Sequence, residues 1–365
     1  MKKINLLLFF LFILVSCNQD TECNNIENQT ESKLQSYVEI VKSLNDLSSL
    51  KNICETEEDY NLIKEAISIT GRFDLQEIAF PSENLKVINF DNTGLLLKSK
   101  GDNYVYQGDM ILTEDQARLL SNNKFDIPTF EIPEDSVPNF DFVSGDILTD
   151  IPDITNTKSI GIVYYQCQYM WPRSSDNKYC VFYVIDPQMT TNTKKMVTDA
   201  IAHWEANTNV RFFPRTTASD YIEFFNGDGC WSFVGRKGGK QQLSIDAGWG
   251  ARGNAIHEIG HAVGFFHEQC KFKRDEHINI HYDNIKSESK PNYQIRDINC
   301  IASKGFDFQS IMLYSSKNSD AINSNKPVMT RKDGTEWTAQ RNALSEKDIY
   351  LLPWMYYYAY IASFG

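Results

Sequence analysis

The sequence lacks the features of two broad classes of protein. Its 365 residues carry 36 Lys and Arg against 48 Asp and Glu, a net charge of −12, so there is no basic excess for binding nucleic-acid phosphates. No apolar run reaches the roughly 18–20 residues that a membrane-spanning helix needs. Hydrophobic residues nevertheless make up 42% of the chain. The length and composition therefore predict about two folded domains rather than a nucleic-acid-binding or polytopic membrane protein.

The first seventeen residues have the pattern of an export signal. Lys2 and Lys3 precede an apolar run over residues 6–15 that is shorter than a membrane span. Residues 14–17 resemble a bacterial lipobox, in which Cys17 is lipidated and becomes the new N-terminus; an ordinary secretory signal is the alternative. Both interpretations predict an exported protein, either secreted or held at the cell envelope, with membrane contact only through a lipid on Cys17.

Cysteine is present eight times, and an odd number remains once Cys17 is set aside. Seven cysteines cannot all pair within one chain, so at least one is free, intermolecular or metal-bound. Disulfides persist in the compartment that the export signal implies. Proximity in the sequence suggests the pairs Cys167–Cys180 and Cys270–Cys300.

Charge is shared unevenly along the chain. Residues 18–157 contain 27 acidic and 10 basic side chains, whereas residues 158–365 contain 21 and 24. Residues 125–157 hold eight carboxylates and four prolines but no Lys or Arg, which favours an extended linker. We predict a signal peptide over 1–17, a first domain over 18–124, an acidic linker over 125–159 and a second domain over 160–365.

Apolar patterning strengthens in the second domain. Residues 180–185, 210–213 and 221–225 read as strands, and residues 193–206 have apolar side chains at helical spacing. This mixture of strands and helices predicts an α/β or α+β lobe.

Three of the six histidines fall within one eleven-residue run. His257 and His261 are four residues apart, so a helix places both on one face, where they can bind one metal ion. Glu258 lies beside that face and can reach a metal-bound water. Gly264 can adopt a positive φ, which allows the helix to end and the chain to return His267 as a third ligand. Three nitrogen ligands with an open position suit a catalytic zinc, one per chain.

Three segments of the second domain resemble one family. Residues 257–275 (HEIGHAVGFFHEQCKFKRD) are similar to the signature of the astacins, which are metzincin zinc endopeptidases. Residues 230–244 resemble the strand at the upper rim of the astacin cleft, and residues 310–314 resemble the Met-turn. The resemblance covers about 160–365. It implies an α+β, two-lobed peptidase domain with a mixed sheet, an active-site helix and a mostly irregular C-terminal lobe, preceded by a small prodomain with few helices or strands.

The resemblance also implies a role for each matched residue. The three histidines would bind zinc, and Glu258 would be the general base. Met312 would form the floor beneath the metal, and Tyr314 would be a detachable fifth ligand that stabilises the oxyanion. Glu268 would hold the freed N-terminus of the mature enzyme.

The chain departs from the family pattern at several positions. Leu313 replaces the usual His of the Met-turn, and Lys271 and Lys273 stand where Arg and Asp are usual. Trp249 stands near the expected partner of Cys230. The disulfide scheme of the family is therefore not transferable, and Cys230 is the first candidate for an unpaired thiol.

The first domain carries candidates for an inhibitor of the zinc site. Residues 106–116 resemble the astacin pro-segment motif, in which Asp109 takes the place of the catalytic water on zinc. Gly108 would allow the backbone to approach the cleft closely. A surface turn is the alternative interpretation. A thiolate from Cys23 or Cys54 is an alternative switch, since a free thiol can also block zinc.

These observations predict a zinc metalloendopeptidase that hydrolyses proteins or peptides and is exported as a zymogen. Its own prodomain would be the intramolecular inhibitor, removed by cleavage in the linker. The alternative is a catalytically silent, lipid-anchored binding or adhesion protein that retains zinc, but intact Glu258 and Tyr314 argue against it. Lys317, Lys326 and Arg331 are candidates for a substrate pocket that favours acidic side chains, or else are solvated surface charges.

Overall fold

The chain divides into two compact units, Met1–Arg72 and Phe73–Gly365. The signal segment lies outside the described residues, and none of the described helices is long and apolar enough to cross a membrane. The computed structural model describes residues 20–43, 57–70, 72, 85–121, 131–132, 169–248, 250–295, 302–303 and 305–361.

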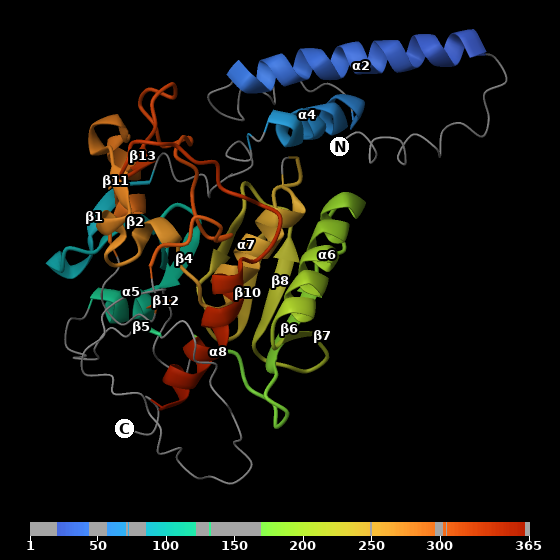
Figure 1. Cartoon of the computed structure of the whole chain (residues 1–365). Coiled ribbons are helices and arrows are strands. Elements are labelled where there is room, and N and C mark those ends of the chain that lie inside the picture. The colour runs from blue at the N-terminus through green and yellow to red at the C-terminus, as the bar shows by residue number, and fades with distance from the viewer. Residues whose placement is uncertain are drawn as a thin grey trace. The chain divides into compact units, whose positions relative to one another are not determined.

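The first unit contains a pair of helices, α2 (Asp20–Ser43) and α4 (Glu57–Thr70), and α4 packs against one part of the longer α2 (Figure 1). Val41, Ile63 and Ile67 are buried in this unit. Apolar side chains at helical spacing explain why the two helices pair, because each buries its apolar stripe against a neighbour.

The second unit is built on a nine-stranded mixed sheet with the order β1-β2-β3-β4-β9-β10-β8-β6-β7. Strands β10, β8, β6 and β7 run parallel, and β9 is antiparallel to β10. The strands are β1 (Val87–Asn89), β2 (Leu96–Lys100), β3 (Asn103–Tyr106), β4 (Met110–Thr113), β6 (Tyr179–Ile185), β7 (Val210–Pro214), β8 (Tyr221–Phe225), β9 (Trp231–Phe233) and β10 (Lys240–Ser244).

Four strands of this sheet come from the segment before the acidic linker. Strands β1 to β4 form antiparallel hairpins, and β4 pairs in parallel with β9, with Met110 opposite Ser232 and Ile111 opposite Phe233. A short helix, α5 (Glu114–Ser121), follows β4. The expectation of few helices or strands in this segment is wrong. Its short strands alternate weakly in polarity, and pairing with the distant β9 stabilises them.

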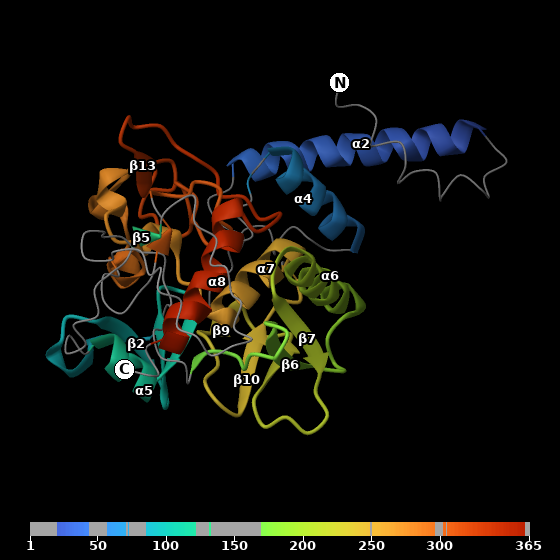
Figure 2. The same cartoon turned by 60° about the horizontal axis from the view of Figure 1, so that its bottom comes forward.

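Two helices cover one face of the sheet, α6 (Thr191–Asn207) and α7 (Arg252–Val263) (Figures 1 and 2). Helix α6 begins at Thr190, whose side chain accepts a hydrogen bond from the Thr193 amide at 3.1 Å. The fully buried Trp204 lies in the core between helices and sheet. The strands and the helix predicted for this region are confirmed to within two residues at each end.

The C-terminal part is mostly irregular, as the family resemblance implies. It contains two small sheets, a series of short 3-10 turns and a final helix, α8 (Glu346–Ile361). One sheet pairs β11 (Ile278–Ile280) with β13 (Met329–Arg331). The other pairs β12 (Ala302–Ser303) with β5 (Glu131–Ile132), the one described part of the predicted linker.

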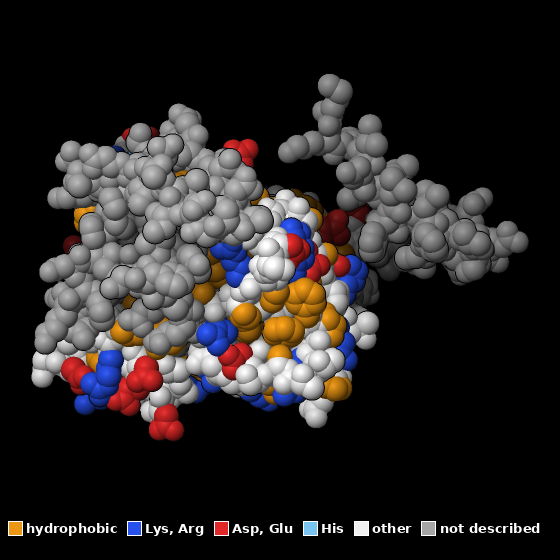
Figure 3. Space-filling model, turned by 90° about the horizontal axis from the view of Figure 1, so that it is seen from below, with side chains coloured by type: hydrophobic (Ala, Val, Ile, Leu, Met, Phe, Trp, Pro, Cys, Tyr) orange, Lys and Arg blue, Asp and Glu red, His pale blue; other side chains and the backbone are white. Residues whose placement is uncertain are grey.

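Hydrophobic side chains also reach the surface of the molecule. The underside shows a patch of them bordered by Lys, Arg, Asp and Glu (Figure 3). Among the described residues of the second unit, the exposed large hydrophobic residues are Phe213, Tyr282 and Ile322. Scattered exposure of this kind is normal for a folded protein. The buried core instead lies between the sheet, α6, α7 and α8.

Candidate metal centre

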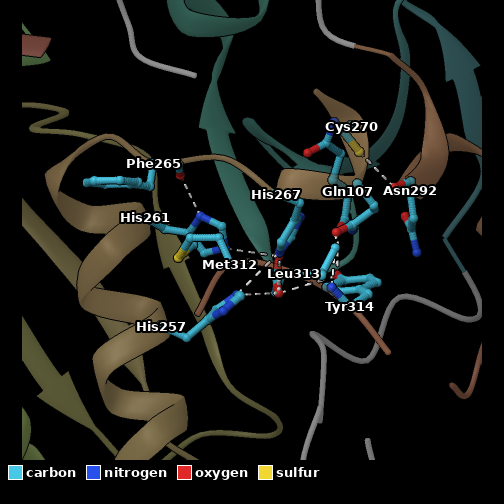
Figure 4. A network of polar contacts seen from close by, with 12 residues as sticks. Gln107, His257, His261, Phe265, His267, Cys270, Asn292, Met312, Leu313 and Tyr314 are labelled. Carbon is cyan, nitrogen blue, oxygen red and sulfur yellow. Dashed lines mark hydrogen bonds and ion pairs between the residues drawn. The ribbon is translucent and has the colours of Figure 1, made fainter. Parts of the chain in front are cut away.

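Helix α7 carries two of the predicted ligands, and glycines set its position. A Cβ at Gly253 would lie 1.8 Å from the Arg341 carbonyl oxygen, so only glycine permits this backbone contact. Gly264 ends the helix with φ +115, a conformation that strongly favours glycine. The chain then turns, and His267 is brought back beside His257 and His261, as the spacing predicts (Figure 4).

The imidazoles are oriented by backbone carbonyls. Nδ1 of His257 lies 2.8 Å from the Ile311 carbonyl oxygen, and Nδ1 of His261 lies 2.7 Å from that of Phe265. A carbonyl oxygen can only accept a hydrogen bond, so each Nδ1 carries the N–H and each Nε2 keeps its lone pair. Nε2 of His257 and Nε2 of His267 are 3.3 Å apart. The lone pairs are therefore turned toward a common centre.

Asp109 places its carboxylate at this centre. Its Oδ2 lies 3.1 Å from Nε2 of His267 and 3.4 Å from Nε2 of His257. Its Oδ1 lies 3.4 Å from Nε2 of His261. The structure thus brings together one carboxylate and three imidazoles from segments that are about 150 residues apart in the sequence.

These four residues fit a zinc ion. One ligand atom from each lies within 4.8 Å of the others, and all four residues are buried. Asp109 Oδ1 and His261 Nε2 have no hydrogen-bond partner among the described residues, although buried polar atoms are normally paired. Three nitrogens and one oxygen form a donor set that suits tetrahedral zinc.

The protonation states also suit a metal centre. Burial lowers the pKa of His257 to about 3 and that of His267 to about 4, which keeps both imidazoles neutral. Burial alone would raise the pKa of Asp109, but His267 and His261 outweigh it and hold the pKa well below its usual range. Neutral imidazoles and an ionised carboxylate are the forms that bind metal.

Glu258 lies beside the centre and takes no part in the carboxylate–imidazole contacts. Its side chain is buried, and Oε2 has no hydrogen-bond partner among the described residues. Burial, followed by the nearby charge of Asp109, raises the pKa of Glu258 well above its usual value. The side chain lines a cavity of about 30 Å³ together with His257 and Tyr314, so the cavity has room for a water molecule.

The Met-turn lies beneath the histidines. A Cβ at Gly260 would lie 2.7 Å from Met312 Sδ, so this glycine leaves room for the methionine under α7. Asp348 of α8 anchors the turn, because its carboxylate accepts hydrogen bonds from the Ser310 hydroxyl at 2.7 Å and the Ile311 amide at 2.9 Å. Gly260 and Asp348 were not predicted from the sequence. Asp348 follows Ser345 at the spacing of a helix N-terminus, which is a signal that could have found it.

Tyr314 contacts the segment that carries Asp109. Its hydroxyl donates a hydrogen bond to the Gln107 carbonyl at 2.9 Å and lies 3.4 Å from Asp109 Oδ2. A Cβ at Gly108, where φ is +96, would lie 3.0 Å from this hydroxyl. Figure 4 shows Tyr314 and Gln107 side by side next to the histidines. The glycine is therefore needed where the chain passes the tyrosine.

Glu268 follows the third histidine and is paired within its own turn. It accepts hydrogen bonds from the Lys271 ammonium at 2.9 Å and from the Asp307 amide at 2.8 Å. Burial raises its pKa to about 7, against the opposing effect of Lys271. The expected contact with a freed N-terminus stays a prediction.

Three cysteines have described side chains, and they form no disulfide with one another. They are Cys180, Cys230 and Cys270. The partners predicted for the first and the last of them, Cys167 and Cys300, lie outside the described residues, so those disulfides stay predictions. Burial raises the pKa of Cys270 to about 12 and that of Cys230 well above its usual value.

The structure gives no side-chain position for the two alternative switch cysteines, so the thiol switch stays a prediction. Cys54 lies outside the described residues, and Cys23 lies in α2 of the first unit, where its side chain is not described. Among the described residues, Asp109 alone of the three candidates for the switch contacts the histidines.

The basic residues after the Met-turn have other partners. Lys317 forms an ion pair with Glu336 at 2.9 Å, and Arg331 lies 4.5 Å over the Phe308 ring. Lys326 is exposed. None of the three basic residues lines the cavity beside Glu258, which favours their interpretation as surface charges.

Comparison with known proteins bears on the second unit. The family model described as Astacin, a peptidase family, matches residues 165–357, more than half of the chain. Blastula protease 10 of Paracentrotus lividus is 34% identical over 264 residues, 69% of this chain and 38% of that protein. Protein SpAN of Strongylocentrotus purpuratus is 38% identical over 184 residues, 46% of this chain and 29% of that protein. The chain spans less than two fifths of the length of these two relatives.

A solved structure is also similar. High choriolytic enzyme 1, a hatching enzyme zinc-protease from Oryzias latipes, is 30% identical and superposes with a TM-score of 0.49, covering 52% of this chain and 96% of that chain. The family match rests on the sequence model and includes the three histidines, Glu258 and the Met-turn. This chain belongs to the astacin family of zinc metalloendopeptidases.

Proposed function

We propose that the chain is an exported zymogen of a zinc endopeptidase that hydrolyses peptide bonds in proteins. The observation that carries the proposal is the convergence of three imidazole Nε2 atoms beside a buried, unpaired carboxylate oxygen of Glu258. A site that only held a metal for stability would have no need of a base at that place.

The proposed reaction divides the chemistry between the metal and three side chains. Zinc, when bound, polarises the scissile carbonyl and lowers the pKa of a water molecule to about 7. Glu258 takes a proton from the attacking water and delivers it to the leaving amine. The Tyr314 hydroxyl donates a hydrogen bond to the carbonyl oxygen as negative charge develops on it. Met312 packs beneath the imidazoles and supports them from below.

The proposal assigns inhibition to Asp109. Its carboxylate oxygens lie 3.1–3.4 Å from the imidazole nitrogens, the place that substrate and water need. The adjoining Gln107 carbonyl accepts the hydrogen bond of the Tyr314 hydroxyl. Both contacts support a segment that blocks the centre until it is removed. Cleavage in the acidic linker would then release the active second domain.

Export and lipid attachment belong to the same proposal. Lys2, Lys3 and the apolar run that follows them support an export signal, and the sequence around Cys17 supports lipid attachment. Cleavage in the linker would separate the active enzyme from a lipid on Cys17, so the released form would be soluble in the surrounding medium.

The test is a protein-digestion assay on the full chain before and after limited cleavage with immobilised trypsin that is then removed. We expect casein hydrolysis only after cleavage, abolished by a chelator and restored by zinc. Glu258→Gln is the matched control. It should retain one zinc per chain but lose about 10²–10⁴-fold in kcat. Full activity of that variant, or an inactive wild-type chain with zinc bound, would reject the proposal.

A further inference from the structure

The cavity beside the metal centre has a second acidic side chain that the proposed reaction does not use. Asp320 lines it with Asn292 and Asn318, in the same cavity as His257 and Glu258. The residue is half-buried and lines the cavity, so its carboxylate borders the space beside the metal centre. Among the described residues, the remaining carboxylates of the cavity lining are those of Asp109 and Glu258.

The carboxylate of Asp320 is fixed in direction by neutral donors. Its Oδ2 accepts a hydrogen bond from the Tyr293 hydroxyl at 2.9 Å and from the Asn292 side-chain amide at 3.2 Å. Hydrogen bonds to an anion are stronger than those between neutral groups and hold it in place. The tyrosine and the asparagine are neutral, so neither of them neutralises the negative charge of Asp320.

Asn292 links this carboxylate to the reaction centre. Its Nδ2, 3.2 Å from Asp320 Oδ2, lies 3.3 Å from the place that a Cβ at Gly108 would occupy. That same place is 3.0 Å from the Tyr314 hydroxyl. The Asn292 side-chain amide thus lies between the Asp320 carboxylate and the backbone at Gly108, which passes the Tyr314 hydroxyl. Figure 4 shows Asn292, Gln107 and Tyr314 close together.

A buried lysine of the segment before the linker acts electrostatically on this carboxylate. Lys98 of β2 is 5% exposed, and its charge acts on Asp320 and lowers the pKa that burial raises. Strand β2 is attached at this wall, because the Gln294 side chain accepts a hydrogen bond from the Leu96 amide at 3.3 Å and donates one to the Gly94 carbonyl at 2.8 Å. The full-length chain therefore supplies a cation to Asp320.

The cavity lining also contains one arginine, Arg341. Arg341 donates Nη1 to the carbonyl oxygens of Ile311 and Leu313, each at 3.0 Å. Its guanidinium thus holds the Met-turn backbone, which is a structural task. Asp320 is the charged group of the cavity whose cation departs with the segment before the linker.

We propose that Asp320 forms a subsite that binds a Lys or Arg side chain next to the scissile bond, and that Lys98 fills this subsite in the full-length chain. The inference rests on the proposed function. A buried carboxylate is stable when it is paired, and it loses Lys98 when the segment is removed. A basic substrate side chain restores the pair. The substrates are therefore proteins with a Lys or Arg beside the cleaved bond.

The first test compares peptides that differ only in having Lys, Leu or Glu at one position next to the scissile bond. The activated chain should cleave the Lys peptide best, and Asp320→Asn should lower the Lys-to-Leu ratio of kcat/KM about 10-fold, since a charged hydrogen bond is lost. Asp320→Lys should favour the Glu peptide. Asp283→Asn removes an exposed carboxylate and is the matched control for the ratio.

The outcomes separate the subsite from the activity. Cleavage of the Lys, Leu and Glu peptides at equal rates would overturn the subsite and leave the endopeptidase intact. Failure to cleave any peptide with zinc bound would overturn both. Background cleavage is measured with the Glu258→Gln variant, so residual trypsin is not mistaken for the enzyme.

A second test needs no activity. Lys98→Met and Asp320→Asn each remove one side of the pair in the full-length chain. If Lys98 fills the subsite, the loss of thermal stability in the double variant should be smaller than the sum of the two single losses, because paired groups are not additive. Strict additivity would show that the two side chains are not coupled and would overturn the assignment of Lys98.

Discussion

Two parts of the second unit meet at the metal centre and are built differently. The histidine-bearing wall consists of α7 and the Met-turn. Its helix is buried from Gly253 to Val263, and backbone carbonyls fix two of its imidazoles. The plug, residues 107–109, enters through two residues with positive φ, Gln107 at 49° and Gly108 at 96°. It is continuous with β4, which pairs with β9 over only two residue pairs.

This difference indicates which of the two parts depends on the other for its conformation. A left-handed conformation at a residue other than glycine costs about 1–3 kcal/mol and persists only where surrounding contacts maintain it. The plug is therefore held by what its side chains and carbonyls contact, chiefly the imidazoles and Tyr314. The wall is oriented by its own neighbours, so we expect it to keep its geometry if the plug is removed.

Asp109→Ala is the variant from which we expect the largest effect on the plug. A charge-assisted contact is worth about 3 kcal/mol, so its loss should raise the open population, and with it the activity of the uncleaved chain, about 100-fold. The measurement is casein hydrolysis by the full-length variant without trypsin, at equal zinc content.

Two matched variants decide which residue blocks the centre. Asp115→Ala removes an exposed carboxylate of α5 and should leave the uncleaved chain inactive. Cys23→Ser should also leave it inactive. Activity that appears on mutation of Cys23 rather than Asp109 would transfer the switch to the thiol.

Tyr314→Phe tests a side chain of the wall that contacts the plug. The hydroxyl donates to the plug at Gln107 before cleavage and, in the proposed reaction, to the substrate oxygen afterwards. Loss of one such donor costs about 10²-fold in kcat of the cleaved enzyme. Zinc content, measured by elemental analysis, should not change, because the imidazoles keep their own carbonyl partners. A variant that loses its metal would assign Tyr314 to the metal site instead.

The wall was largely predictable from sequence, for a local reason. The spacing of His257 and His261 fixes a helix face, and Gly264 fixes where that helix ends, since both properties depend on a few adjacent residues. The strands of the sheet near α6 were predictable in the same way, because their apolar side chains alternate or run together over five to seven residues.

The plug and its attachments were less predictable, because distant residues make them. Asp109 was suggested by a family motif, but its pairing through β4 with β9 joins segments about 120 residues apart. The position of Lys98 near Asp320 joins segments more than 200 residues apart, and no local pattern indicates either contact. The need for a glycine at position 260 could not be predicted locally, because the Met312 sulfur that a Cβ would meet lies on another element.

Gly260→Ala tests the wall alone and should have the smallest effect. The added Cβ would lie 2.7 Å from Met312 Sδ and 3.7 Å from the Trp204 ring. Overpacking of this kind costs about 1–3 kcal/mol, offset in part by the better helix propensity of alanine. Denaturant unfolding of the zinc-loaded chain gives the difference.

Gly248→Ala is the control for that measurement, since its Cβ would meet only the Asp246 carboxylate at an ordinary 3.4 Å. If Gly260→Ala were as stable as Gly248→Ala, Met312 would move aside without a loss of stability. The floor beneath the histidines would then not be rigid. A loss confined to Gly260→Ala, with the plug still in place and the uncleaved chain still inactive, would show that the wall can be weakened without opening the centre. The two parts would then be separable in energy as well as in construction.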